Sequence, residues 1–181
     1  MMTTPDDTRS RILAAARELF AERGYARTSL ADIAAAVGLT KTAVAYHFHP
    51  KDRLATELLA PCVEDMFTLL GTEFGGDRQA FAEALTGFVV RHRAVVRLFM
   101  EDLGGADDAP PGSTGEAVRT FRDELFARLT GPDPDDEARL RGWAVLGALQ
   151  LSVTQTMDLP EERVRRSLVR SVLTIVGRNA G

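Results

Sequence analysis

Two short helices joined by a tight turn are the strongest structural signal in this sequence of 181 residues. Ser29 and Asp32 have the spacing of a capping box, so they are expected to open a helix. Gly38 suits the left-handed residue that ends such a helix, and Thr40 can cap the next one. So short a connection makes the second helix cross the first at a steep angle, which is the arrangement of a helix-turn-helix.

Helix signals continue through the rest of the chain, and no stretch alternates apolar and polar residues as a half-buried strand would. A first helix is predicted from Thr4 and Pro5 to Gly24, and a fourth from Pro50 to the pair Gly75 and Gly76. Later helix starts are predicted at Asp77, at Ser113 with Glu116, at Asp133 before Pro134, and at Asp158 or Leu159 before Pro160. The predicted fold class is therefore all-α.

The distribution of charge is more informative than its sum. The chain has a formal net charge of -4, yet residues 1–55 hold eight Lys or Arg against six Asp or Glu. The N-terminal part is therefore mildly basic and the remainder acidic, which suits DNA binding by the N-terminal part.

The cellular location follows from cysteine usage and from the N-terminus. Cys62 is the only cysteine, which excludes an internal disulfide and fits a reducing compartment. The first residues are acidic where a signal peptide needs basic ones, and no apolar run approaches the ~18 residues of a membrane span. We expect a cytoplasmic protein with no membrane partner.

The segment from Thr28 to Leu54 divides into an apolar face and a polar face. The apolar residues expected to be buried against the first helix are Leu30, Ile33, Ala34, Val37, Leu39, Val44 and Phe48. A recognition helix directs its N-terminal residues at base edges in the major groove, and phosphate contacts fix its register. The residues expected to contact DNA are Thr40, Lys41, Thr42 and Ala43 at the bases, followed by Tyr46 and His47 at the DNA backbone.

Lys51 gives a separate indication of a bound anion. It falls in the first turn of the predicted fourth helix, where the helix dipole disfavours a cation. A DNA phosphate at this helix end would accept hydrogen bonds from the backbone N–H groups and from the lysine, so we expect Lys51 to contact a phosphate. The alternative is that Asp52 offsets the charge of Lys51 on a solvated surface.

Several short motifs in this region have a known counterpart. They are Gly24-Tyr25, Thr28, Ile33-Ala34, Gly38-Leu39, Thr40-Lys41, Tyr46-His47-Phe48, and Lys51 with Leu54. Together they resemble the N-terminal signature of the TetR family of repressors over about residues 8 to 56, without a gap, and Thr28 is counted among the expected DNA contacts. One departure is Ala45, which stands where the family often has Tyr, so the DNA-backbone contact from that position is expected to pass in part to Tyr46.

The resemblance implies a three-helix DNA-binding domain over residues 1–50 and a helical regulatory and dimerisation domain over residues 51–181, with about nine helices in all. It implies a homodimer joined through its last two helices, a double-stranded palindromic operator, and a small-molecule effector that releases the repressor. Apolar stripes on the last two helices support the dimer. The candidates for its interface are Leu149, Val153, Val164, Leu168, Val172 and Ile175, although an amphipathic helix packed inside a monomer would have the same pattern.

A ligand pocket of the kind implied by the resemblance combines apolar walls with a few polar groups. The candidate residues are Phe67, Phe99, Met100 and Trp143 for the walls, and Arg91, His92 or Gln150 for the polar contacts. The alternative is that the Met and aromatic residues belong to an ordinary core.

An enzyme has little support in the sequence. His47, His49 and Asp52 lack further ligands at a suitable spacing, so no metal is expected. No phosphate-binding loop, nucleophile elbow or Cys-His pair indicates catalysis or a cofactor. The sequence is also compatible with a ligand-independent or architectural DNA-binding dimer, and with an activator of transcription.

Overall fold

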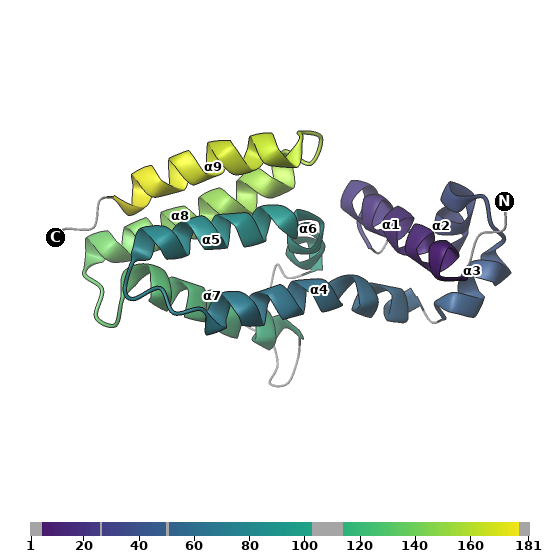
Figure 1. Ribbon diagram of the computed structural model, residues 1–181, viewed down its shortest axis with the longest axis horizontal. Helices are drawn as coiled ribbons and strands as arrows, with labels where there is room; N and C mark the ends of the chain where they lie inside the picture. The colour runs from purple at the N-terminus through teal and green to yellow at the C-terminus, as the bar shows by residue number, and fades with distance from the viewer. Residues whose placement is uncertain (1–4, 26, 50, 103–113, 178–181) are drawn as a thin grey trace. The chain divides into compact units, whose positions relative to one another are not determined.

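The computed structural model of the chain describes residues 5–25, 27–49, 51–102 and 114–177 (Figure 1). The nine helices in these described residues are α1 (Pro5–Arg23), α2 (Leu30–Val37), α3 (Lys41–His47), α4 (Lys51–Gly71), α5 (Arg78–Arg91), α6 (Arg93–Asp102), α7 (Thr114–Thr130), α8 (Asp136–Gln155) and α9 (Glu161–Val176). The prediction of an all-α fold with about nine helices is confirmed.

The chain divides into two compact units, residues 1–67 and residues 68–181. Helix α4 continues from one unit into the next, with most of its length in the first. The boundary drawn from the sequence, between residues 50 and 51, lies just before α4.

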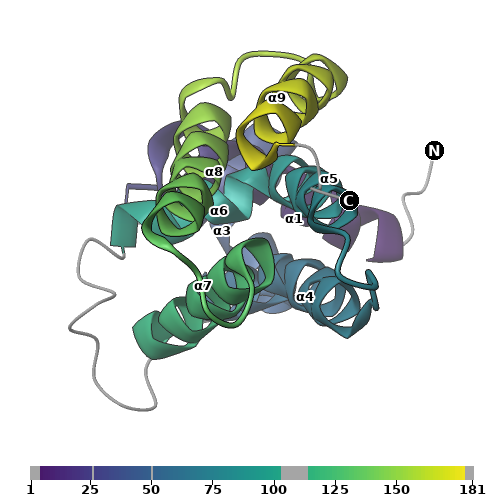
Figure 2. The ribbon, with the colours of Figure 1, turned by 90° about the vertical axis from the view of Figure 1, so that its left-hand side faces the viewer.

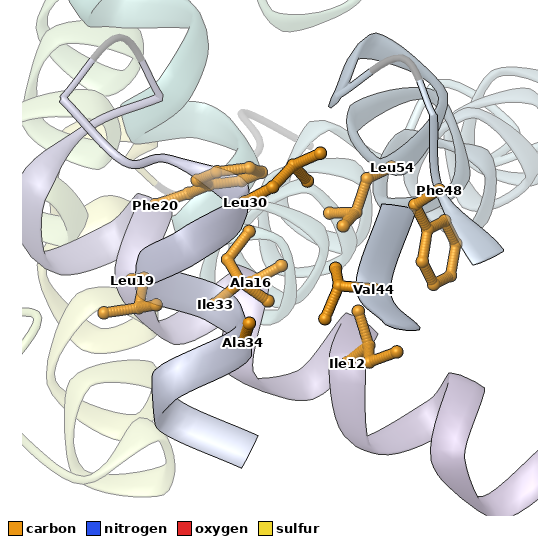
Figure 3. Close-up of a cluster of buried hydrophobic side chains, with 10 residues drawn as sticks. All are labelled: Ile12, Ala16, Leu19, Phe20, Leu30, Ile33, Ala34, Val44, Phe48 and Leu54. Atoms are coloured by element: carbon orange, nitrogen blue, oxygen red, sulfur yellow. The ribbon is translucent and has the colours of Figure 1, made fainter. Parts of the chain in front are cut away.

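A small hydrophobic core holds the N-terminal unit together (Figure 3). Its members are Ile12, Ala16, Leu19 and Phe20 from α1, Leu30, Ile33 and Ala34 from α2, Val44 and Phe48 from α3 and its C-cap, and Leu54 from α4. Val37 and Leu39 pack against this cluster as partly buried residues. Each large apolar side chain taken out of water contributes about 1.5–3 kcal/mol, so this core fixes α2 and α3 on α1.

Helix α5 is the central element of the C-terminal unit and packs against α6, α7, α8 and α9 (Figure 2). Its buried residues are Phe81, Ala82, Leu85, Thr86, Phe88, Val89 and Val90. Helix α9 runs alongside α5 and α8, as Figures 1 and 2 show. The C-terminal unit is therefore a helical bundle with α5 at its centre.

The apolar stripe of α9 faces the core of its own chain. Val164, Leu168 and Val172 are buried against α5 and α8, Leu149 and Val153 on α8 are buried as well, and Ile175 is half-buried. These five buried side chains do not present an exposed face to a second copy of the chain. The sequence could not separate the two cases because an amphipathic stripe has the same period in a monomer core and in an interface.

Two helix starts differ from the sequence prediction. Helix α8 begins at Asp136 rather than near Asp133, because the Asp135 carboxylate makes the capping hydrogen bond, accepting from the Ala138 N–H at 2.7 Å. Helix α9 begins at Glu161, with Pro160 at the N-cap and no side-chain cap. Ser113 lies outside the described residues.

Gly142 lies on α8 directly against side chains of α7. A Cβ atom at this position would lie 2.6 Å from Thr130 Cγ2 and 2.9 Å from Phe126 Cε2. Thr130 is buried and its hydroxyl donates to the Phe126 carbonyl at 2.9 Å, so it has little room to move. We expect Gly142→Ala to lower the free energy of unfolding by about 1–3 kcal/mol in chemical denaturation.

A matched control for this substitution is Gly87→Ala in α5. The nearest atom to its added Cβ is Arg165 Nε at 3.9 Å, an ordinary contact. Alanine favours a helix interior over glycine by roughly 0.5–1 kcal/mol, so the control should be neutral or stabilising. Equal effects of the two substitutions would contradict the close approach of α7 and α8.

Candidate DNA-binding site

Local hydrogen bonds set both ends of α2. The Ser29 side chain accepts from the Asp32 N–H at 3.2 Å, and the Asp32 carboxylate accepts from the Ser29 N–H at 2.7 Å, which confirms the predicted capping box. The hydrogen bonds from the Ser29 side chain and backbone hold the pKa of Asp32 below its usual value. Gly38 ends the helix with φ +70°, in the left-handed region, also as predicted.

Helix α3 is a short helix that two apolar residues fix to the core of the N-terminal unit. Thr40 caps it by accepting from the Ala43 N–H at 3.1 Å, so the predicted cap is confirmed. Val44 and Phe48 are fully buried in the core under the helix. These two anchors leave the opposite side of α3 to the polar residues.

That polar side presents most of the residues expected to contact DNA. Thr40, Lys41 and Thr42 are exposed, and Tyr46 is 87% exposed. Ala43 and His47 are half-buried, and the Tyr46 and His47 rings pack edge to face with centroids 5.4 Å apart. One short helix with its cap therefore presents two hydroxyls, an ammonium and a phenol close together.

Thr28 does not belong to this surface. Its side chain is only 1% exposed, and its hydroxyl donates to the carbonyls of Gly24 at 2.9 Å and Leu19 at 3.3 Å. The resemblance to the TetR signature placed it among the expected DNA contacts, but the side chain points back to the end of α1. Thr28 has a structural role in this position, and we leave it out of the proposed contacts.

Lys51 is engaged within the N-terminal unit. It is half-buried, its ammonium donates to the Tyr25 carbonyl, and the same ammonium lies 3.8 Å from the centroid of the Tyr25 ring. The carbonyl and the ring face supply the negative partial charge that the sequence had suggested a phosphate would supply.

Three arginines of this unit also bind within it. Arg9 and Arg53 both pair with the Glu57 carboxylate, and Arg11 donates to the Val37 carbonyl at 2.8 Å at the end of α2. Sequence reasoning missed the contacts of Arg9 and Arg11, because their partners lie far away along the chain, whereas Arg53 and Glu57 are only one helical turn apart. The mild positive charge of residues 1–55 is therefore partly used to join α1 to α2 and α4.

The residues expected to line a ligand pocket lie on several helices. Phe67 on α4, Arg91 at the end of α5, and Trp143 and Gln150 on α8 are exposed, and His92 is half-buried. Phe99 and Met100 belong to α6, but their side chains lie outside the described residues. Trp143 stacks on Phe126 with ring centroids 4.7 Å apart, and Arg122 lies over the indole at 5.5 Å.

A different set of residues lines a small cavity in the C-terminal unit. Its lining residues are Arg78, Leu129, Ala138, Arg141, Gly142, Val145 and Val176. Its volume of about 20 Å³ suits a single water molecule rather than an organic ligand.

The described residues offer little for other chemistry. They contain no group of His, Cys, Asp and Glu that could hold a metal ion, and none of their helices is long and apolar enough to cross a membrane. Burial raises the pKa of Cys62 to about 11, with Asp65 adding to the shift, so the thiol stays protonated at neutral pH.

Comparison with known proteins relates the N-terminal part of this chain to a known family. The family described as "Bacterial regulatory proteins, tetR family" matches residues 12–58. A transcriptional repressor of the HTH type from Mycobacterium tuberculosis is 29% identical over 186 residues, 97% of this chain and 93% of that protein. Residues 12–58 of this chain therefore have the N-terminal sequence pattern of the TetR family. The HTH-type transcriptional regulator TtgR of Pseudomonas putida is 47% identical over 53 residues, 29% of this chain and 25% of TtgR, so the match spans a quarter of that relative.

Solved structures share the fold of this chain. PfmR of Thermus thermophilus, a TetR-family transcriptional regulator, superposes with a TM-score of 0.62 at 24% identity over 99% of this chain and 100% of that one. The ketosteroid transcriptional regulator KstR2 of Mycobacterium tuberculosis gives 0.70 at 18% identity over 96% and 95% of the two chains. At identities below 25%, these structural matches show the shared fold alone.

Thr28 provides a test of the site geometry. Thr28→Val keeps the shape of the side chain but leaves the Gly24 and Leu19 carbonyls without this donor, so we expect a loss of about 1–3 kcal/mol in the free energy of unfolding. Thr28→Ser keeps the hydroxyl and should recover most of that loss. Thermal or urea unfolding measures both variants. If Thr28→Val were as stable as the parent while its DNA affinity fell, Thr28 would belong to the DNA-contacting surface after all.

Proposed function

We propose that the protein is a homodimeric transcriptional repressor that binds a palindromic operator through α3 and is released by a small molecule. The observation that carries the proposal is the division of α3 into two sides. Val44 and Phe48 are buried in the core, and Lys41, Thr42 and Tyr46 are exposed opposite them. A helix held from one side and polar on the other fits a major groove.

Each exposed group on α3 has a role that suits its chemistry. Thr42 and the methyl group of Ala43 are proposed to read base edges, and Lys41 to bind guanine or a phosphate. Thr40 can still donate its hydroxyl hydrogen while its oxygen caps the helix. Tyr46 and His47 are proposed to bind phosphates, with Tyr46 taking part of the role of the residue that Ala45 replaces.

A dimer would place two copies of α3 about 34 Å apart, one turn of DNA, to bind two half-sites. Since the stripe of α9 packs inside its own chain, we propose the exposed apolar face of α8 as the main contact between copies. This face presents Leu140, Trp143 and Leu151, which are 73%, 46% and 64% exposed, with Gly147 between them. Exposed apolar side chains of this size on one helix face favour burial by a partner surface.

Release by a small molecule requires a ligand that prefers a conformation with weaker operator binding. A tenfold loss of operator affinity corresponds to about 1.4 kcal/mol of differential binding. In this proposal residues 1–50 form the DNA-binding domain and residues 51–181 the regulatory domain, with α4 as the continuous connection. The protein needs no cofactor, catalyses no reaction and acts in the cytoplasm.

The first experiment is fluorescence-anisotropy binding of the purified protein to the DNA upstream of its own gene, over a range of salt concentrations. Binding should be tight, dependent on a palindrome, and lost with a scrambled duplex. Lys41→Ala should reduce the slope of log affinity against log salt by about one unit, because one phosphate contact is removed. Arg139→Ala, which removes an exposed cation from α8, is the matched control and should leave the slope unchanged. Equal weak binding to both duplexes would instead favour an architectural DNA-binding protein.

The dimer surface is tested by one charge placed on α8. Leu151→Glu should shift the protein from dimer to monomer in sedimentation velocity, because burying a carboxylate in an apolar contact is costly. Ala127→Glu on α7 adds the same charge at an exposed position of another helix and should leave the dimer intact. A fully dimeric Leu151→Glu protein would exclude this face of α8 as the main interface.

A further inference from the structure

Lys51 makes a set of contacts that DNA binding does not explain. Its ammonium donates to the Tyr25 carbonyl and lies 3.8 Å from the centroid of the Tyr25 ring and 5.7 Å from that of Phe20. The two rings pack edge to face with centroids 5.1 Å apart, and Phe20 is buried. The lysine therefore closes a small cluster formed by the end of α1 and the connection that follows it.

This cluster accounts for a cation at an unfavourable place. Lys51 is the first residue of α4, where the positive end of the helix dipole repels it. The Tyr25 carbonyl oxygen and the negative faces of the two rings compensate this repulsion inside the protein. A DNA phosphate is therefore not needed to explain the position of the charge.

The Tyr25 carbonyl is also part of the turn that starts α2. It accepts a second hydrogen bond, from the Thr28 N–H at 3.2 Å, and the Thr28 hydroxyl binds back to the Gly24 carbonyl at 2.9 Å. The next residue, Ser29, is the N-cap of α2, which packs against α3. A shift of the first turn of α4 would therefore pull on the point where the helix-turn-helix begins.

We infer that Lys51 is a positioning residue that clamps α4 to Tyr25 and so sets the orientation of the helix-turn-helix, rather than a ligand of a DNA phosphate. The part of this inference that concerns operator binding rests on the proposed function. The contact itself does not. The two ends of the clamp, Lys51 and Tyr25, lie 26 residues apart in the sequence.

The first test uses the fact that Lys41 and Lys51 are the only lysines in the chain. Biosynthetic labelling of lysine with carbon-13 gives two side-chain signals in the full-length protein, assigned with Lys41→Arg and Lys51→Arg. The Tyr25 ring should shift the ε-methylene signal of Lys51 upfield, and Tyr25→Leu should return it to an ordinary position. Tyr25→Phe keeps the ring and should keep the shift. A wild-type protein without an upfield signal has no clamp, and the inference fails.

Addition of operator DNA to the same sample separates clamping from phosphate binding. The Lys51 signal should stay upfield in the complex while the signal of exposed Lys41 moves, because only Lys41 is proposed to touch DNA. A Lys51 signal that returns to an ordinary position on addition of DNA would show that the ammonium leaves Tyr25 for a phosphate. That outcome would overturn the inference.

The second test measures the functional coupling of the two residues. Lys51→Met, Tyr25→Leu and the double variant are titrated with operator over a range of salt concentrations, with Tyr25→Phe as the control that keeps the ring. We expect both single variants to weaken operator binding at an unchanged salt slope. The double variant should lose no more affinity than whichever single variant binds the operator more weakly. If Lys51 instead contacted a phosphate, Lys51→Met would lower the slope of log affinity against log salt by about one unit. The fold-losses of affinity of Lys51→Met and Tyr25→Leu would then multiply in the double variant.

Failure of the proposed function would be recognised separately. If the wild-type protein bound no duplex with specificity, operator binding would be wrong, yet the ring shift without DNA would still report on the contact. Thermal unfolding of the same variants would then show whether the contact between Lys51 and Tyr25 stabilises the protein. Non-additive losses of stability would support a clamp between α4 and Tyr25, and additive losses would contradict it.

Discussion

The burial of Val44 and Phe48 is the interaction on which the DNA-binding surface depends. Helix α3 has seven residues, and a helix of that length does not form in water on its own. Its backbone hydrogen bonds persist because the Thr40 cap starts it and the two apolar anchors fix it on α1 and α2. The exposed polar groups of α3 can therefore be presented rigidly only while the small core of the N-terminal unit stays intact (Figure 3).

Features determined by a few neighbouring residues could be predicted from the sequence. The capping box of Ser29 and Asp32 and the left-handed Gly38 are local, since each involves atoms within about one helical turn. The apolar pattern of residues 30–48 was equally readable, because its period matches two short helices. The start of α8 was less readable, because Asp133 and Asp135 both have the chemistry of a cap and only the structure shows which one accepts the bond.

Contacts between distant residues could not be predicted in this way. Lys51 reaches Tyr25 and Arg11 reaches Val37, and each pair spans 26 residues. The sequence showed only that a cation at the start of α4 needed compensation, and a phosphate and an aromatic ring meet that need equally well. The same limit applies to α9, whose apolar stripe would look identical inside a monomer or between two copies.

Helix α4 is held near both ends by a cation bound to a carbonyl. At its start Lys51 of the helix binds the Tyr25 carbonyl, and near its end Arg128 of α7 donates to the Leu70 carbonyl at 2.7 Å while pairing with Glu124. The first contact lies within the N-terminal unit and the second within the C-terminal unit. Under the proposed function, an effector that acts through α4 would have to do so at these contacts, because they bind the helix to its neighbours within each unit.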